Sequence, residues 1–524
     1  MIRIGEIKLK LEETEEVLEQ KIKKKLHIHK EDILSWSIYK KGLDARKKET
    51  IHYVYTVDVK LKNEKKVLER TRAKNITIAP DMTYYFPQGK SLLKTKPIII
   101  GFGPAGMFAG LLLAEMGLCP IILERGEDVD RRSKTVQEFW AGKALNVESN
   151  VQFGEGGAGT FSDGKLTTRS KDIRSRKVLE ELVEAGAPPE ILYENKPHIG
   201  TDKLKEVVKN IRKKIISLGG EVCFDSKVTD LKIAEGKIKA VIVNETKRIN
   251  TEVVVLATGH SARDMFELLQ QKGICLEQKP FAMGVRIEHK QSMINQAQYG
   301  QNAPNLPAAD YKLTYTTKKG RAVYTFCMCP GGMVVNASSE KGRLAINGMS
   351  EYQRDGVNAN SALLVQVFPE DFGSQNVLEG MFLQRKLEEK AFQSGKGAVP
   401  VQLVGDFLEG KSSEKWGEIQ STCLPYVQFC NIADILPQFM TDALQEAIPE
   451  FEKKLQGFAK KDAILTAVES RSSSPIRIVR NGQRQSISVK GLYPIGEGAG
   501  YAGGIVSAAI DGIITAEIIF QKDK

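Results

Sequence analysis

The chain of 524 residues contains few cysteines, histidines and tryptophans, with seven, six and three respectively. The cysteines are sparse and odd in number, which argues against the disulfide framework of a small secreted domain and favours reduced thiols. The histidines show no spacing that is typical of metal ligands, and no metal site is predicted. These scarcities exclude small disulfide-rich proteins and histidine-based zinc sites.

Neither a signal peptide nor a membrane span is indicated. Charged residues recur from Arg3 onward and leave no apolar segment of the kind that a signal peptide needs. Residues 97–114 carry no charge, but four glycines and Pro104 interrupt them. A buried strand, a glycine turn and a buried helix explain this stretch better than a membrane span does. We therefore expect a cytoplasmic protein with no membrane partner.

The residues that are present are those of a large globular protein. Hydrophobic residues make up 41% and charged residues 27%, and the length suggests roughly three domains. The net charge of +11 is uneven, because residues 1–96 carry 23 Lys and Arg against 14 Asp and Glu, whereas the rest carry 53 against 51. The basic N-terminal part could attract RNA or another acidic partner, although a solvated face that docks on the body explains the same charges. The oligomeric state is left open.

Hydrophobic periodicity divides the chain into four segments. Residues 1–88 follow the order β-α-β-β-α-β, which predicts a ferredoxin-like α+β domain, and residues 87–96 form a linker. Residues 96–275 follow a βαβ pattern, residues 276–465 are a mixed α+β insertion, and residues 466–524 return to a strand, a glycine-rich turn and a helix. The predicted fold class is α/β, with a Rossmann-like domain split in sequence around an inserted substrate or cap domain.

A dinucleotide fingerprint follows the first strand of the βαβ segment. The pattern G-x-G-x-x-G occurs at residues 101–106, 154–159 and 498–503. Only the first copy is preceded by a strand, followed by a helix and completed by an acidic residue, Glu124, at the end of a second strand. Its glycines allow a tight turn, the approach of a pyrophosphate and close packing of helix on strand. The helix N-terminus would hold the phosphates, and Glu124 would accept hydrogen bonds from a ribose.

Two later segments favour FAD over NAD. Residues 491–504 form a strand and a glycine-rich turn before the last helix, and Glu497 in this turn can accept hydrogen bonds from the ribitol hydroxyls of FAD. Residues 255–259 end another strand in a turn of small residues. Such turns are common singly, but in this order they are typical of FAD proteins built on the same unit.

Four longer strings carry a resemblance to known flavoproteins. They lie at residues 149–166, 324–332, 347–350 and 496–505. Together with the fingerprint they resemble the glutathione-reductase-type FAD superfamily and, more narrowly, a bacterial family known as FAD-dependent dehydrogenases. The resemblance covers nearly the whole chain and implies an FAD-dependent oxidoreductase. The wider superfamily usually has Asp where this chain has Glu497, so the ribitol contact is less secure here.

The predicted cofactor residues come from the motifs and from the resemblance together. The resemblance places residues 149–166 in a loop beside the flavin and the backbone of Val228 against the adenine. It also makes Arg125 or Arg132 a candidate for a ribose or phosphate contact, with a surface ion pair as the alternative. The predicted FAD-binding residues are Gly101, Gly103, Pro104, Ala105, Gly106, Glu124, Arg125, Arg132, Gly157, Ala158, Gly159, Ser162, Asp163, Lys165, Val228, Ala257, Thr258, Gly259, Gly496, Glu497, Gly503, Gly504 and Ile505.

Cys327 and Cys329 are the candidate catalytic thiols, together with Arg471. In a strand, residues i and i+2 share a face, so both thiols could reach a flavin. Three interpretations stay open, namely buried small side chains, thiols of a substrate site, and a redox disulfide or metal site. Arg471 and the nearby Arg477 could bind an anionic substrate or stabilise reduced flavin, or else form ion pairs.

The leading hypothesis is flavin-mediated transfer of a hydride or of electrons between FAD and a small molecule. No second fingerprint for a nicotinamide cofactor is present, so NAD(P)H would dock transiently or another donor would supply electrons. Two alternatives remain. One is an FAD-dependent RNA-modifying enzyme that the basic N-terminal domain recruits, and the other is a non-enzymatic flavin sensor or electron-transfer protein. The sequence identifies no substrate.

Overall fold

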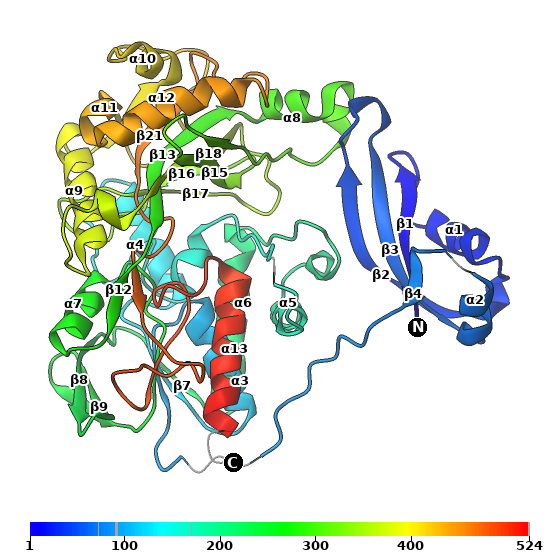
Figure 1. Cartoon of the computed structure of the whole chain (residues 1–524), viewed down its shortest axis with the longest axis horizontal. Coiled ribbons are helices and arrows are strands. Elements are labelled where there is room, and N and C mark those ends of the chain that lie inside the picture. Colours follow the sequence, from blue (N-terminus) through cyan, green and yellow to red (C-terminus); the bar gives the residue numbers. More distant parts are fainter. Residues whose placement is uncertain (72, 90–92, 169, 522–524) are drawn as a thin grey trace.

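The computed structural model of the chain describes residues 1–71, 73–89, 93–168 and 170–521, and it shows a small N-terminal unit beside a larger body (Figure 1). An extended segment joins the two, and residues 90–92 of the expected linker lie outside the described residues. None of the helices in the described part of the chain has the length and apolarity that a bilayer crossing needs.

The N-terminal unit is a four-stranded antiparallel sheet with two helices packed against it. The strand order is β2-β3-β1-β4. Leu18, Ile22 and Val67 of the helices share one apolar core with alternate residues of the strands. The element order and the strand order are those of a split βαβ unit. Its elements are β1 (Ile2–Lys10), α1 (Val17–Leu26), β2 (Ile33–Asp44), β3 (His52–Leu61), α2 (Glu64–Arg70) and β4 (Ile76–Ile78).

A five-stranded parallel sheet of order β23-β11-β5-β6-β7 supports the body. Its central strand β5 is wholly buried, as expected of a parallel strand that is covered on both faces. Strand β23 comes from the C-terminal segment, so two distant parts of the chain build one sheet. The elements before the insertion are β5 (Ile98–Ile100), α3 (Pro104–Glu115), β6 (Ile121–Leu123), α4 (Val129–Trp140), α5 (Arg174–Glu184), α6 (Thr201–Ser217), β7 (Glu221–Cys223), β8 (Val228–Ala234), β9 (Lys237–Val243), β10 (Lys247–Asn250), β11 (Val254–Leu256) and α7 (Arg263–Gln271), and those after it are β22 (Ile476–Ile478), β23 (Leu492–Pro494) and α13 (Ile505–Gln521).

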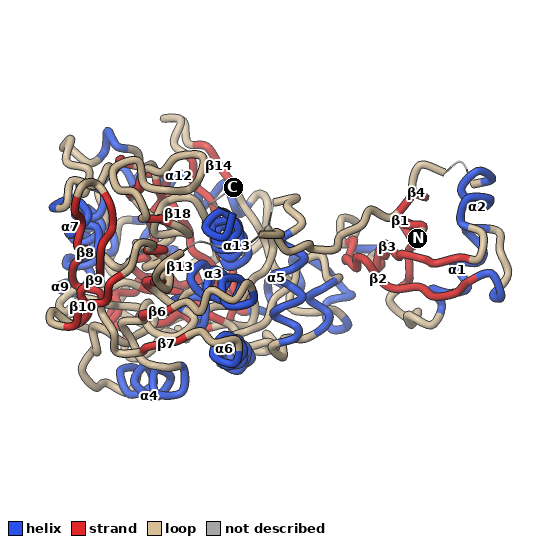
Figure 2. The backbone as a smooth tube through the Cα atoms, turned by 90° about the horizontal axis from the view of Figure 1, so that it is seen from below, coloured by secondary structure: helices blue, strands red, loops and turns tan. Residues whose placement is uncertain are grey.

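Helices α3 and α13 lie side by side on this sheet (Figures 1 and 2). Their backbones touch at Gly512 of α13, where an added Cβ would collide with the carbonyl oxygen of Ala105. Helix α3 is apolar on nearly every side because α13, α6 and the sheet surround it. The long uncharged stretch of the sequence is therefore this buried strand, turn and helix.

The insertion forms a seven-stranded sheet of order β14-β15-β18-β13-β21-β19-β20, with helices over it (Figure 1). The boundary expected at residue 465 falls inside β21, which pairs with β13 and β19. A short pairing of β12 with β22 links the two parts of the body. The elements are β12 (Leu276–Gln278), β13 (Phe281–Lys290), α8 (Gln291–Tyr299), β14 (Thr314–Thr316), β15 (Ala322–Cys329), β16 (Met333–Asn336), β17 (Ile346–Met349), β18 (Asn358–Val367), α9 (Glu379–Ser394), β19 (Val399–Leu403), α10 (Val404–Glu409), β20 (Val427–Phe429), α11 (Ile432–Ile435), α12 (Gln438–Glu452) and β21 (Ile464–Glu469).

The N-terminal unit touches the body through the edge strand β2. The amide of Lys41 donates to the carbonyl oxygen of Tyr193 at 2.7 Å, and its carbonyl accepts from the amide of Asn195 at 2.7 Å. Ile51 is buried in the same core cluster as Tyr299 of the body. Main-chain pairing thus covers an edge that would otherwise be exposed.

Candidate functional site

The glycine turn after β5 has the geometry that the fingerprint predicts. Gly101 has a φ of +99°, and a Cβ there would lie 2.5 Å from the carbonyl oxygen of Ala257. A Cβ at Gly106 would collide with the carbonyl oxygen of Gly101. At Gly103 the nearest atom to an added Cβ is the Cα of Gly157, at an ordinary 3.7 Å. The protein itself therefore requires glycine at 101 and 106, whereas Gly103 borders space that a ligand can use.

Glu124 stands at the end of β6 and is buried. Its Oε2 accepts from the amide of Phe102 at 2.8 Å, and its Oε1 accepts from the amides of Gly126 at 3.0 Å and Gly154 at 2.9 Å. A carboxylate has about four acceptor positions, so capacity remains for a ribose hydroxyl. Glu124 thus ties the fingerprint turn to the loop that contains Gly154, in addition to its predicted ligand role.

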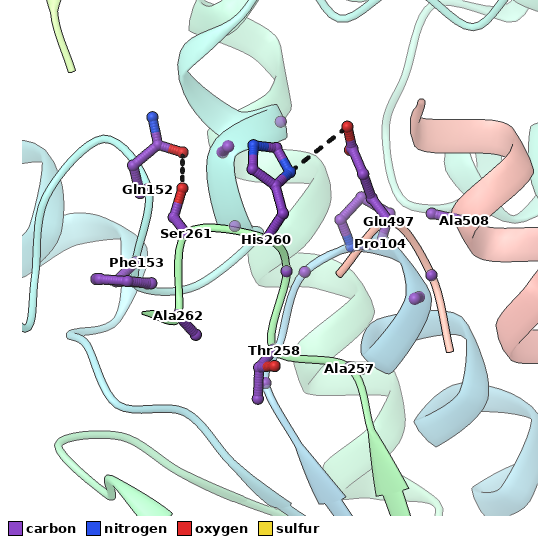
Figure 3. A pocket seen from close by; sticks show the side chains of 18 of the residues that line it. Pro104, Gln152, Phe153, Ala257, Thr258, His260, Ser261, Ala262, Glu497 and Ala508 are labelled. Carbon is purple, nitrogen blue, oxygen red and sulfur yellow. Dashed lines mark hydrogen bonds and ion pairs between the residues drawn. The ribbon is translucent and has the colours of Figure 1, made fainter. Parts of the chain in front are cut away.

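A cavity of about 400 Å³ runs along the carboxyl ends of the parallel strands. Open α/β sheets bind ligands at this edge, and the volume lies in the range of cofactor pockets. Figure 3 shows Gln152 and Phe153 on one side of it and Glu497 and Ala508 on the other. Twenty of the 23 predicted FAD-binding residues line it, and the exceptions are Gly106, Arg132 and Asp163.

Arg132 has a role other than the predicted cofactor contact. It is fully buried and donates to the backbone carbonyl oxygens of Asn150 at 2.8 Å, Val151 at 3.0 Å and Glu155 at 2.6 Å. Burial lowers the pKa of Arg132 to about 10. Arg132 therefore shapes the loop at residues 149–156 from behind the cavity.

Asp163 likewise lies outside the cavity lining. Its carboxylate is buried and forms ion pairs with Arg354 and, at 3.3 Å, with Lys165. These cations help to hold the pKa of Asp163 below its ordinary value although burial opposes them. Asp163 positions Lys165, which does line the cavity.

Arg125 lines the cavity at the end where Glu124 lies. Its guanidinium pairs with Asp264 through two hydrogen bonds of 2.9 and 2.8 Å and with Glu148 at 2.6 Å, and it lies over the ring of Phe153. Val228 begins β8 and lines the same end. The predicted alternative for Arg125, an ion pair, is thus present, and the residue faces the cavity as well.

The other end of the cavity holds the predicted residue Glu497 together with His260. The sequence analysis did not single out His260. His260 Nε2 lies 2.9 Å from the carbonyl oxygen of Arg471, which can only accept, so Nε2 carries the proton and Nδ1 is the bare nitrogen. Nδ1 faces Glu497 Oε1 at 3.6 Å (Figure 3). Burial lowers the pKa of His260 to about 4, and desolvation raises that of Glu497 to about 7 although Lys279 opposes it. A protonated Glu497 suits this arrangement because a carboxylate would face a lone pair.

Arg471 lines the cavity from a buried network of charges. Its guanidinium donates to both carboxylate oxygens of Glu388 at 3.0 Å, and Arg263 pairs with the same carboxylate at 2.7 Å. The pKa of Glu388 stays well below its ordinary value because the two guanidinium groups outweigh the effect of burial. Arg471 is thus held in place by ion pairing and still borders the cavity.

The two candidate thiols lie at a bulge in β15. Phe326 pairs with Ala362 but Cys329 pairs with Asn360, so one extra residue is inserted, and Cys327 has a left-handed φ of +42°. The bulge interrupts the regular alternation of faces on which the prediction for residues i and i+2 depends. Cys327 lines the cavity, whereas Cys329 is fully buried behind it.

Residues that the sequence analysis missed come mainly from turns and from the insertion. Besides His260, they include Ser261. Gln152 and Asn347 also line the cavity, and they lie in the strings at residues 149–166 and 347–350 without having been named as site residues. Ser261 donates to Gln152 at 3.0 Å, so the turn after β11 is joined to the 149–166 loop. His260 directly follows Gly259 of the predicted turn, and this position after a parallel strand was the available signal.

The residues present fit FAD. The cavity is long, two glycine turns border it, and added Cβ atoms at Gly503 and Gly504 would meet nothing within 4 Å. Glu124 and Glu497 offer side-chain carboxyl oxygens toward its two ends. Among the described residues there is no cluster of side chains that could hold a metal ion.

Comparison with known proteins identifies the family. Residues 280–472 match the model of the "FAD-dependent protein, C-terminal domain-like" family, and residues 1–60 match a domain of unknown function, DUF8436. Over residues 280–472 the chain thus resembles the C-terminal domain of FAD-dependent proteins. It belongs to the same family as an "uncharacterized protein" of Clostridium beijerinckii, with which it shares 52% identity over 99% of each chain.

Solved structures of low similarity also match most of the chain. They include the flavin-dependent brominase Bmp2, with 14% identity, 82% of this chain and 79% of that chain covered and a TM-score of 0.38. Glycine oxidase from Geobacillus kaustophilus matches with 11% identity, 82% and 95% coverage and a TM-score of 0.38.

Proposed function

We propose that the protein is an FAD-dependent oxidoreductase that acts on a small molecule. The observation that carries the proposal is the single cavity into which the fingerprint turn, the 255–259 turn and the 495–505 turn all open. When bound, FAD would supply transfer of a hydride or of electrons. NAD(P)H as a transient electron donor stays part of the proposal, although the sequence has no second fingerprint for a nicotinamide cofactor.

The residues divide the cavity into a binding part and a reacting part. Glu124, Gly103 and Val228 would hold the adenosine and the pyrophosphate, aided by the N-terminus of α3. Glu497, Lys165 and the residues from 503 to 505 would hold the flavin end. Arg471 offers a fixed positive charge there, which would orient an anionic substrate or favour a negatively charged form of the reduced cofactor.

Gly103 provides the sharpest test of cofactor binding. The Gly103→Ala substitution adds a Cβ that meets no protein atom closely, so the fold should be preserved while the pyrophosphate path is obstructed. Crowding of this kind costs about 1–3 kcal/mol, which corresponds to FAD binding about fivefold to 150-fold weaker. Binding is measured by titrating the apoprotein with FAD and following the flavin spectrum.

Gly482→Ala is the matched control, because a Cβ there meets no atom within 4 Å and Gly482 is not among the residues that line the cavity. This variant should bind FAD as the wild type does. A purified wild-type protein that neither contains FAD nor takes it up would defeat the proposal, and equal affinities of the two variants would remove Gly103 from the site.

A further inference from the structure

The pair Cys327 and Cys329 is the feature of the cavity that FAD binding does not explain. In a regular strand, the Cβ atoms of residues i and i+2 are roughly 6.5 Å apart, beyond the 3.5–4.5 Å that a disulfide spans. The bulge and the left-handed conformation of Cys327 change this geometry. The Cys329 thiol donates to the carbonyl oxygen of Cys327 at 3.3 Å, so its sulfur lies back against the residue whose thiol it would meet.

Two buried or half-buried cations stand beside the pair. Arg286 is fully buried, and its Nη1 lies 3.3 Å from the carbonyl oxygen of Cys327 and 3.9 Å from Cys329 Sγ. Lys165 donates its Nζ to the carbonyl oxygen of Met328, between the two cysteines. Positive charges around a thiol stabilise its thiolate, which is the reactive form.

The two thiols have different protonation properties. The hydrogen bond from Cys329, followed by Lys165 and Arg286, lowers the pKa of Cys327, and the same hydrogen bond with burial raises that of Cys329. Cys327, which lines the cavity, is therefore the thiol that ionises more readily, and Cys329, buried behind it, is the thiol that keeps its proton. This is the division between an attacking and a resolving thiol.

We propose that Cys327 and Cys329 are a redox-active dithiol, which closes to a disulfide by passing two electrons to the flavin held in the cavity. One S–S bond forms and the S–H bond of Cys329 breaks. The sulfur pair loses two electrons and one proton, and oxidised flavin takes up all three to become the reduced, singly protonated form. The inference rests on the proposed function, because the electron acceptor is FAD.

Electron counting on the FAD-containing protein tests the proposal. Oxidised wild-type protein is titrated anaerobically with dithionite, and we expect four electrons per FAD, two for the flavin and two for the disulfide. Cys327→Ser and Cys329→Ala should each take up two. Cys275→Ser is the control and should take up four, because Cys275 lies outside the cavity lining. Uptake of two electrons by a wild type that contains FAD would overturn the dithiol while leaving the proposed function intact.

A second measurement does not depend on FAD. The wild-type protein is equilibrated with mixtures of glutathione and glutathione disulfide, then alkylated and digested. The mass of the peptide that contains Cys327 and Cys329 is measured by mass spectrometry. We expect this peptide to be two hydrogens lighter and unalkylated. Alkylation of both thiols, or glutathione on one of them, under all ratios of glutathione to its disulfide would overturn the proposal. Failure of FAD to bind, with the disulfide formed, would count against the proposed function and against the electron acceptor, but not against the thiol pair.

Discussion

At the scale of single residues, the side chains with the largest effect on the site are buried and polar. Arg132 shows this most clearly, because its guanidinium is the donor to three carbonyl oxygens of the 149–156 loop. We expect Arg132→Ala to lower the free energy of unfolding by about 2–4 kcal/mol, since buried acceptors lose their partners. It should also weaken FAD binding, because Gln152 and Phe153 of this loop line the cavity.

Urea unfolding of the apoprotein measures this effect, and Arg131→Ala is the neighbouring control. Arg131 is 56% exposed and pairs with Glu127 and Asp225 at the surface. Its removal should cost less than about 1 kcal/mol. If the two variants were equally stable, Arg132 would not organise the loop.

A second prediction at the scale of single residues concerns the effect of Glu497 on how stability depends on pH. Its pKa is raised in the folded state from 4.5 to about 7, so the folded chain holds a proton that the unfolded chain has released. Between pH 4.5 and 7 this group should therefore reduce stability as pH rises. Glu497→Gln imitates the protonated form and should remove that part of the slope.

The measurement is the free energy of unfolding of the apoproteins at pH 5 and pH 8. The variant should gain on the wild type at pH 8 and differ little from it at pH 5. His260 contributes the opposite slope in both proteins, because its pKa is lowered to about 4 and its stabilising effect is lost as pH falls below 6.5. If the difference in the free energy of unfolding between variant and wild type were the same at pH 5 and at pH 8, Glu497 would not be protonated in the folded protein.

At the scale of elements, the contact of α3 with α13 decides whether the fingerprint turn keeps its shape. A Cβ at Gly512 would collide with the carbonyl oxygen of Ala105, in the first turn of α3. We expect Gly512→Ala to push the helices apart, to lower stability by about 1–3 kcal/mol and to weaken FAD binding. Thermal unfolding and FAD titration check it, with Gly482→Ala as the same change at an open position. Wild-type affinity in the Gly512 variant would mean that the turn does not depend on this contact.

The elements also show what a sequence can and cannot predict. The strand, turn and helix at residues 98–115 follow from local rules, because Gly101 needs a positive φ and a buried parallel strand is uniformly apolar. The bulge at Cys327 does not follow, since its cause is the pairing of β15 with a strand more than thirty residues away. The role of Arg132 is hidden for the same reason, because its partners are backbone atoms that any residue supplies.

At the scale of the whole molecule, the basic charge of the N-terminal unit is partly paired within it. Lys21 pairs with Glu13 at 2.6 Å, Lys23 with Glu19 at 3.7 Å, and Lys25 donates to the carbonyl oxygen of Gly5 at 2.7 Å. These contacts favour the alternative of a solvated face that docks on the body. An RNA or acidic partner stays a hypothesis, and a filter-binding assay with tRNA at low salt would test it.

The same scale gives a prediction about a chain that begins at residue 93 and lacks the N-terminal unit. Every residue that lines the cavity lies at position 100 or later, so this shorter chain should still bind FAD. It should be less stable by about 2 kcal/mol or more, because Ile51 no longer covers the apolar cluster near Tyr299 and the amide of Asn195 loses its acceptor. Thermal unfolding measures the loss of stability, and the release of flavin during unfolding shows whether the shorter chain binds FAD. If the shorter chain folded with the stability of the full chain but bound no FAD, the N-terminal unit would belong to the cofactor site, and the division between a docked cap and a self-sufficient flavin body would have to be abandoned.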